Sequence, residues 1–170
     1  MRKNIIITGF MGTGKSVTAK ELAQRLEMEF IDMDRVIEER QGASIADIFD
    51  RYGEKYFREQ ENILVRELSL QENLVIATGG GTFLNLDNIK TMNQEGKVIC
   101  LYATPQALYS RLEKKNNRPL IKGDNLLNKI NHLLERRKKI YESFDYKINT
   151  SNLSVQEVVD KIVTLLKLER

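Results

Sequence analysis

Short runs of aliphatic and β-branched residues alternate along the chain with longer stretches in which apolar residues recur at helical spacing. The runs predict strands at residues 4–8, 29–31, 74–78, 97–102 and 146–149. A helical stripe follows the first run, and the clearest stripe extends from Val155 to Leu166, after Ser154 and Glu157 at the spacing of a capping box. Strands that alternate with helices predict an α/β fold with a parallel sheet and helices on both of its faces.

Length and composition narrow the class of protein. The 170 residues fit one domain, 1–170, whose core needs no disulfide. The net charge of +3 is too weak to indicate a nucleic-acid partner. No apolar run approaches the roughly 20 residues of a membrane span, and the N-terminus lacks the pattern of a signal peptide. Because Cys100 is the single cysteine, we expect a cytoplasmic protein, a monomer without a membrane partner.

The first predicted strand runs directly into the sequence Gly-Phe-Met-Gly-Thr-Gly-Lys-Ser at residues 9–16, and a helix is predicted next. This is the G-x-x-x-x-G-K-[ST] phosphate-binding motif in its strand–loop–helix setting. Glycines let backbone N–H groups approach phosphate oxygens, and the helix N-terminus adds positive potential. Lys15 can reach the β- and γ-phosphates, and the Ser16 hydroxyl can ligate Mg²⁺.

Two carboxylates, Asp32 and Asp34, follow the second predicted strand. Ligands bind at the carboxyl edge of open α/β sheets, and residues two apart on an extended chain point to the same side. One carboxylate would then serve the Mg²⁺ shell and the other a substrate hydroxyl. The pair also fits the N-cap and first turn of a helix over residues 35–41.

Three consecutive glycines, Gly79, Gly80 and Gly81, follow the third predicted strand. Such a run indicates that another group approaches the backbone closely, and its N–H groups could hold a carboxylate or hydroxyl. Arginines that could meet an anionic substrate stand at positions 58, 118, 136 and 137. The planar guanidinium binds carboxylate or phosphate through two parallel hydrogen bonds, which a lysine cannot imitate.

Together these residues resemble the shikimate kinase family, in the nucleoside-monophosphate-kinase-like branch of P-loop folds. The phosphate-binding motif alone is generic. The ordered series D-x-D, F-R-x-x-E, T-G-G-G, R-P-L and R-x-x-x-Y is specific and covers nearly the whole chain. The resemblance implies a three-layer P-loop kinase fold around a five-stranded parallel sheet. It also implies an enzyme that transfers a phosphoryl group from MgATP to the 3-hydroxyl of shikimate.

The resemblance assigns roles to individual residues. ATP would be bound by Gly12, Thr13, Gly14, Lys15, Ser16, Val17, Arg111, Arg118 and Asn152. Shikimate would be bound by Asp34, Arg58, Gly79, Gly80, Gly81, Arg137, Phe49 and Phe57. The catalytic groups would be Lys15, Asp34 and Arg118, and the Mg²⁺ ligands Ser16 and Asp32. Residues 33–62 would form a helical substrate-binding region, and 113–124 a mobile lid.

One departure from the family pattern leaves an assignment open. The family usually has R-x-P-L-Y where this chain has Arg137-Lys138-Lys139-Ile140-Tyr141, without the proline. The spacing to Tyr141 selects Arg137 as the substrate ligand, but Arg136 would take the role if the helix were rotated. Two other functions also remain open: a related kinase acting on gluconate or a nucleoside monophosphate, and a nucleotide-binding module without transferase activity.

Overall fold

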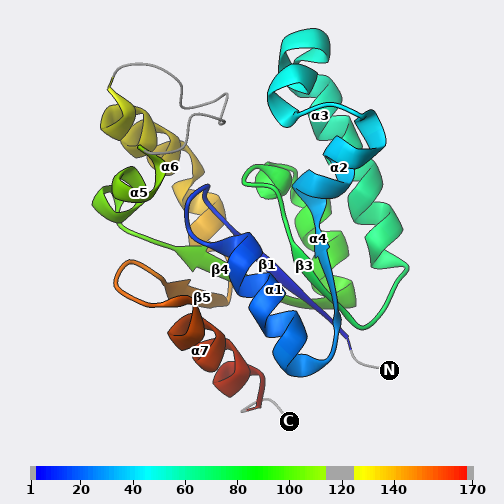
Figure 1. The fold of residues 1–170 in the computed structure, drawn as a ribbon, viewed down its shortest axis with the longest axis vertical. Helices are drawn as coiled ribbons and strands as arrows, with labels where there is room; N and C mark the ends of the chain where they lie inside the picture. The colour runs from blue at the N-terminus through cyan, green and yellow to red at the C-terminus, as the bar shows by residue number, and fades with distance from the viewer. Residues whose placement is uncertain (1–2, 114–124, 168–170) are drawn as a thin grey trace.

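The computed structural model describes residues 3–113 and 125–167, which form a parallel sheet between two layers of helices (Figure 1). The strands are β1 (Asn4–Gly9), β2 (Glu29–Asp32), β3 (Leu74–Ala77), β4 (Gly96–Tyr102) and β5 (Tyr146–Asn149). Their order across the sheet is β2-β3-β1-β4-β5, and every pair is parallel. Each strand lies within one residue of its predicted bounds, so the predicted α/β class and five-stranded sheet are confirmed.

The helices are α1 (Lys15–Leu26), α2 (Met33–Gln41), α3 (Ile45–Ser69), α4 (Leu86–Glu95), α5 (Pro105–Leu112), α6 (Leu126–Glu142) and α7 (Val155–Lys167), with a 3-10 turn η1 (Thr82–Leu84). Several begin at a side-chain cap. Ser44 accepts from the backbone N–H of Asp47 at the start of α3. The Ser154 hydroxyl accepts from the N–H of Glu157, whose carboxylate accepts from the N–H of Ser154, so the predicted capping box is confirmed.

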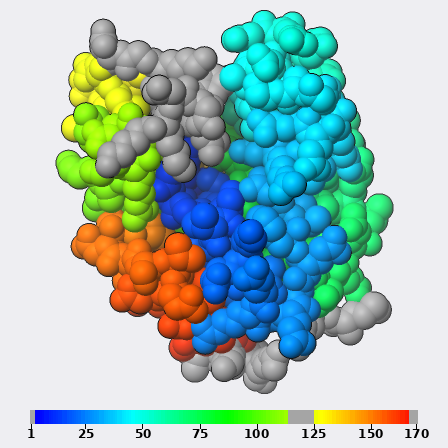
Figure 2. Space-filling model, viewed as in Figure 1, coloured from blue at the N-terminus to red at the C-terminus, as the bar shows by residue number. Residues whose placement is uncertain are grey.

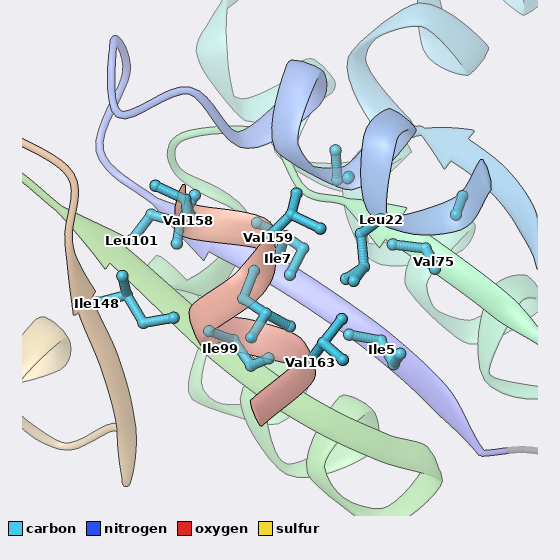
Figure 3. Packing of buried hydrophobic residues seen from close by; sticks show 14 of the residues in the cluster. Ile5, Ile7, Leu22, Val75, Ile99, Leu101, Ile148, Val158, Val159 and Val163 are labelled. Atoms are coloured by element: carbon cyan, nitrogen blue, oxygen red, sulfur yellow. The ribbon is translucent and has the colours of Figure 1, made fainter. Parts of the chain in front are cut away.

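Alternate residues of each central strand face opposite helical layers. On one face α1 and α7 cover the sheet, as Figure 3 shows for Val158, Val159 and Val163 of α7. On the other face, α2, α3 and α4 cover Ile6 of β1 and Val98 of β4. Burial on both faces explains why the strands read as continuous apolar runs rather than as alternating patterns. None of the helices among the described residues is long and apolar enough to cross a bilayer.

Strand β1 lies at the centre of the sheet, between β3 and β4, and the loop that follows it opens at the carboxyl edge. Chain segments on the two sides of β1 rise above this edge: α2 and α3 on one side, α5 and α6 on the other (Figure 1). A third apolar cluster packs Phe10 and Met11 of the loop against Leu108 and Leu112 of α5 and Ile130 of α6. The loop therefore packs against the α5–α6 side of this edge.

Candidate active site

The phosphate-binding loop, residues 9–16, is fixed by close packing at Gly9 and by hydrogen bonds within the loop. Gly9 has φ +140°, and a Cβ there would collide with the carbonyl oxygen of Leu101 on β4. The Phe10 carbonyl oxygen accepts from Thr13 Oγ1 at 2.7 Å and from Lys15 Nζ at 3.1 Å. The side chain of Lys15 is 9% exposed. The loop thus holds a buried ammonium group where helix α1 begins.

A cleft of about 710 Å³ opens over this loop. The predicted nucleotide ligands Gly12, Thr13, Gly14, Lys15, Ser16, Val17 and Arg111 line it, and so does Asp34 from the opposite side. Figure 2 shows the surface hollowed between the cyan atoms of α2 and α3 and the green and yellow atoms of α5 and α6, with blue atoms of the N-terminal segment at its floor. The cleft has the volume of a small-molecule site.

Arg111 joins the loop to the segment after β5. Its guanidinium donates to the carbonyl oxygen of Gly12 at 3.2 Å and to that of Thr150 at 2.6 Å. The Thr150 hydroxyl in turn donates to the carbonyl oxygen of Thr13 at 3.1 Å. Thr150 and Leu153 line the cleft, whereas Asn152 lines a neighbouring hollow of about 320 Å³. Of the two predicted nucleotide ligands in this region, the structure therefore brings only Arg111 to the cleft itself.

The two aspartates do not lie on one extended segment, so that part of the sequence interpretation is wrong. Strand β2 ends at Asp32, whose carboxylate accepts from the Arg35 N–H at 3.3 Å and caps α2. Asp34 belongs to the first turn of that helix and lines the cleft. Helix geometry, rather than strand alternation, therefore aims Asp34 at the cleft.

The three consecutive glycines form a corner that side chains from three directions approach. A Cβ atom at Gly79 would lie 2.7 Å from Asp34 Oδ1, and one at Gly80 would lie 3.4 Å from the Met11 nitrogen. A Cβ atom at Gly81 would lie 2.5 Å from Arg58 Nη1. Close approach of other groups, which the sequence predicted for these glycines, is confirmed.

Arg58 of α3 lies between two carboxylates and above an aromatic ring. Its guanidinium donates to Glu61 at 2.5 Å and to Glu54 at 2.9 Å, and lies 5.5 Å from the centre of the Phe57 ring. Phe57 packs on Phe49 with ring centres 5.0 Å apart. These two rings form an apolar wall below the arginine.

Burial and the neighbouring charges have opposite effects on the pKa values of Arg58 and Glu61. Burial raises the pKa of Glu61, and the nearby charge of Asp34 adds to that rise, whereas Arg58 and the Thr82 hydroxyl oppose it. Burial works against the charge of Arg58, but Glu61 and Glu54 outweigh it and raise the pKa of the guanidinium. Arg58 consequently carries its positive charge at any physiological pH.

A second arginine at the corner, Arg137 of α6, is buried and only 5% exposed. Its Nη1 donates to the carbonyl oxygen of Gly80 at 2.8 Å, and its guanidinium lies 5.6 Å from the centre of the Phe10 ring. Arg136 is exposed on the same helix. Of the two arginines that the sequence left open, the structure brings Arg137 to the glycine corner.

The chain has other groups at the site that sequence reasoning did not single out. Thr78 lines the cleft, Thr82 donates to Glu61, and Phe10 contacts both Lys15 and Arg137. Their residue types carry no signal by themselves, because the contacts depend on packing between distant segments. Arg118 and all of the predicted lid except Glu113 lie outside the described residues.

The donor atoms at the loop fit a magnesium ion. Mg²⁺ prefers oxygen ligands and is usually held by one or two protein groups together with phosphates and water. Ser16 lines the cleft at the start of α1. Asp32 ends strand β2, which is separated from β1 by β3, and does not itself line the cleft. Within residues 3–113 and 125–167 there is no cluster of three His, Cys, Asp or Glu side chains able to hold a metal unaided.

Comparison with known proteins gives a consistent result. The family model described as shikimate kinase matches residues 11–167. A shikimate kinase from Pelotomaculum thermopropionicum is 42% identical over 165 residues, 97% of this chain and 96% of the relative. The solved structure of a shikimate kinase from Acinetobacter baumannii in complex with shikimate is 34% identical, with a TM-score of 0.95 over 100% of this chain and 96% of that one.

One solved structure shares the fold at much lower sequence identity. A gluconokinase from Sinorhizobium meliloti has a TM-score of 0.58 at 15% identity, covering 99% of each chain, and shows a common fold alone. The fold is therefore that of P-loop kinases, as the sequence predicted. The match along 11–167 and the identity to full-length relatives go further: this chain belongs to the shikimate kinase family.

Proposed function

We propose that this chain transfers the γ-phosphoryl group of ATP to the 3-hydroxyl of shikimate. The observation that carries the proposal is the glycine corner at residues 79–81. There Asp34, Arg58 and Arg137 each lie against one of the three glycines, and the cleft beside them contains Lys15. A carboxylate that can hold a hydroxyl, and two arginines that can hold a carboxylate, are the groups that a hydroxylated ring acid requires.

At the nucleotide end, backbone N–H groups of the loop and the N-terminus of α1 would bind the phosphates. Lys15, whose ammonium group donates one hydrogen bond to the Phe10 carbonyl oxygen, would pair with the β- and γ-phosphates. Arg111 would lie beside the adenine, with Asn152 at the outer end of the same segment. Arg118, which is assigned on sequence alone, would add a second cation at the transferring group.

At the acceptor end, Arg58 and Arg137 would bind the carboxylate of shikimate. Both are attached to rigid helices, and both already contact the glycine corner. The N–H groups of the corner would hold ring hydroxyls, and Phe49 and Phe57 would form the apolar wall beneath the ring. Residues 33–62 would thus act as the substrate-binding region.

Catalysis follows from position and charge. Phosphoryl transfer passes through a loose transition state, so the protein contributes mainly alignment and electrostatic stabilisation. Asp34 would accept a hydrogen bond from the 3-hydroxyl and orient its oxygen toward the γ-phosphate. Lys15 would stabilise the charge that develops on the transferring group.

Magnesium belongs to this proposal as well. Ser16 would hold the ion directly, and Asp32 would hold it through water. When bound, the ion would neutralise part of the phosphate charge. The expected loss of turnover on chelation with EDTA, and its recovery on addition of MgCl₂, check this assignment.

A coupled assay for ADP release tests the proposed substrate. Shikimate, gluconate and CMP would be compared as acceptors at equal concentrations with the purified chain. We expect turnover with shikimate far above that with the other two. A higher rate with gluconate or CMP would contradict the proposal, and ATP hydrolysis indifferent to every acceptor would indicate a nucleotide-binding module instead.

The proposal also covers the compartment, the oligomeric state and the partners of the protein. We propose a cytoplasmic monomer that acts on small molecules alone, without nucleic acid or membrane. The modest net charge of +3 supports the part that concerns nucleic acid. Elution at the monomer position in size-exclusion chromatography, with and without substrates, is the expected result.

A further inference from the structure

Glu61 is a buried carboxylate with both oxygen atoms engaged. It lies near the middle of α3 and is 1% exposed. One oxygen accepts from Arg58 Nη1 at 2.5 Å, and the other accepts from Thr82 Oγ1 at 2.6 Å. Two directional hydrogen bonds to opposite oxygens fix the plane of the carboxylate.

Thr82 is itself held in place. It is 1% exposed and begins the turn η1 directly after the glycine corner. Its carbonyl oxygen accepts from the side-chain amide of Asn88 on α4 at 2.9 Å, and that amide also donates to Asn62 on α3 at 2.8 Å. The main chain at Thr82 is thus linked through Asn88 to α4 and α3, and this fixes the position from which the hydroxyl reaches Glu61.

The space around these groups leaves little room for other arrangements. A Cβ atom at Gly79 would collide with Glu61 and lie 3.0 Å from Thr82 Oγ1. The Arg58 guanidinium lies against Gly81 at the next turn of the same corner. A change in the plane of the Glu61 carboxylate would therefore change the direction in which the guanidinium points.

We propose that Thr82 is a positioning residue for the acceptor site: its hydroxyl fixes the Glu61 carboxylate, which holds the Arg58 guanidinium ready for the carboxylate of the substrate. This inference rests on the proposed function, because it requires Arg58 to bind that carboxylate. Thr82 does not line the cleft, and it would act only through Glu61 and Arg58.

The test substitution removes the Thr82 hydroxyl and keeps the shape of the side chain. Thr82→Val leaves one Glu61 oxygen buried without its donor, and we expect KM for shikimate to rise on the order of 10-fold. KM for ATP and kcat should stay within about twofold, because the nucleotide site and the reacting hydroxyl keep their contacts. Thr82→Ser retains the hydroxyl and should restore KM for shikimate.

Controls separate positioning from folding. Thr164→Val removes an exposed hydroxyl that donates to the Asp160 carbonyl oxygen on α7, and should leave both KM values unchanged. Thermal unfolding of every variant is measured beside the kinetics. If Thr82→Val does not fold, Thr82→Ala, which removes the same hydroxyl without adding bulk, takes its place.

A double-mutant cycle tests the route through Arg58. Lysine has no planar fork to orient, so Thr82→Val should change KM for shikimate much less in an Arg58→Lys background. The inference would be overturned if the increases in KM for shikimate of the two single variants multiplied in the double variant. It would also be overturned if Thr82→Val left KM for shikimate unchanged, or if it impaired kcat, KM for ATP and KM for shikimate to the same degree. Failure of the wild type to phosphorylate shikimate would instead refute the proposed function and, with it, this inference.

Discussion

At the scale of single residues, Phe10 joins the two halves of the site. Its carbonyl oxygen accepts from Lys15, and its ring lies under the guanidinium of Arg137. Both cationic residues are almost fully buried, so each charge is surrounded mainly by protein groups rather than by water. A cation held in advance needs little reorganisation when charge develops on a phosphoryl group, which is the condition for strong electrostatic catalysis.

The first prediction concerns Lys15. Lys15→Ala should lower kcat by roughly 100- to 1000-fold, because one preorganised cation at the transferring group is lost. Steady-state kinetics with ATP and shikimate measures this. Lys20→Ala, which removes an exposed lysine from the same helix, is the matched control. Turnover near that of the wild type in Lys15→Ala would refute the role of the lysine.

The second prediction concerns Arg58. Arg58→Lys keeps the charge but loses the bidentate geometry, so KM for shikimate should rise at least about 10-fold with little change in KM for ATP. Arg66→Lys on the exposed side of α3 serves as the control. A rise confined to KM for ATP would show instead that Arg58 belongs to the nucleotide site.

At the scale of elements, α3 is interrupted in a way that shapes the proposed acceptor site. Gly53 has φ 80° and ψ 168°, a conformation open in practice to glycine alone. In a straight helix, residues eight apart are separated by about 12 Å along the axis. The Phe49 and Phe57 rings nevertheless lie 5.0 Å apart, one on each side of the break. The interruption thus allows the two rings to form one wall.

The third prediction follows from this break. A Cβ at Gly53 would meet nothing within 4 Å, so Gly53→Ala acts through backbone strain alone. We expect a loss of stability of about 1–3 kcal/mol in urea unfolding, with an increase in KM for shikimate as the wall shifts. Gly42→Ala, at φ 58° and equally open, is the control.

The two variants should differ in one respect. Gly42 ends α2 and carries no part of the apolar wall, so its substitution should lower stability without changing KM. Equal effects of the two substitutions on KM for shikimate would contradict the role given to the break in α3.

At the scale of the whole molecule, the cleft depends on the complete sheet. The loop at residues 9–16 follows β1, the glycine corner follows β3, and Asp34 follows β2. Because these strands are parallel neighbours, their carboxyl ends meet at one edge. The site therefore exists only when the sheet is formed, and the global stability of the fold sets the fraction of molecules that carry it.

The fourth prediction uses Cys100 on β4 to report this global stability. The thiol is 1% exposed, and burial raises its pKa to about 12. On the order of 1 in 10,000 thiols would then be ionised at pH 8. Labelling with DTNB should be very slow in the native protein and prompt in guanidinium chloride.

Ligands should slow this reaction further. ADP and shikimate bind the folded state alone, so they lower the unfolded fraction through which the thiol reacts. Rapid, stoichiometric labelling of the native protein would show that β4 opens without global unfolding.

Parts of the fold and the site could be read from the sequence because they depend on neighbours along the chain. Residues 4–8 are buried on both faces and carry an unbroken apolar run, and the loop motif at residues 9–16 contains its own glycines, lysine and serine. The capping box of Ser154 and Glu157 is equally local. In the loop motif and the capping box, the residues that define the feature lie within a few positions of one another, so the spacing specifies the local geometry. The strand at residues 4–8 pairs with distant segments, and only its burial on both faces is visible as an apolar run.

The tertiary structure decided what depends on the rotation and contacts of distant helices. The sequence did not determine that Arg137 rather than Arg136 faces Gly80, because one residue of α6 corresponds to about 100° of rotation. It also did not show that α2 begins at Met33 and turns Asp34 toward the cleft. The hydrogen bond from Thr82 to Glu61 spans 21 residues. Such contacts arise only when the packed sheet brings α3, the glycine corner and α6 together.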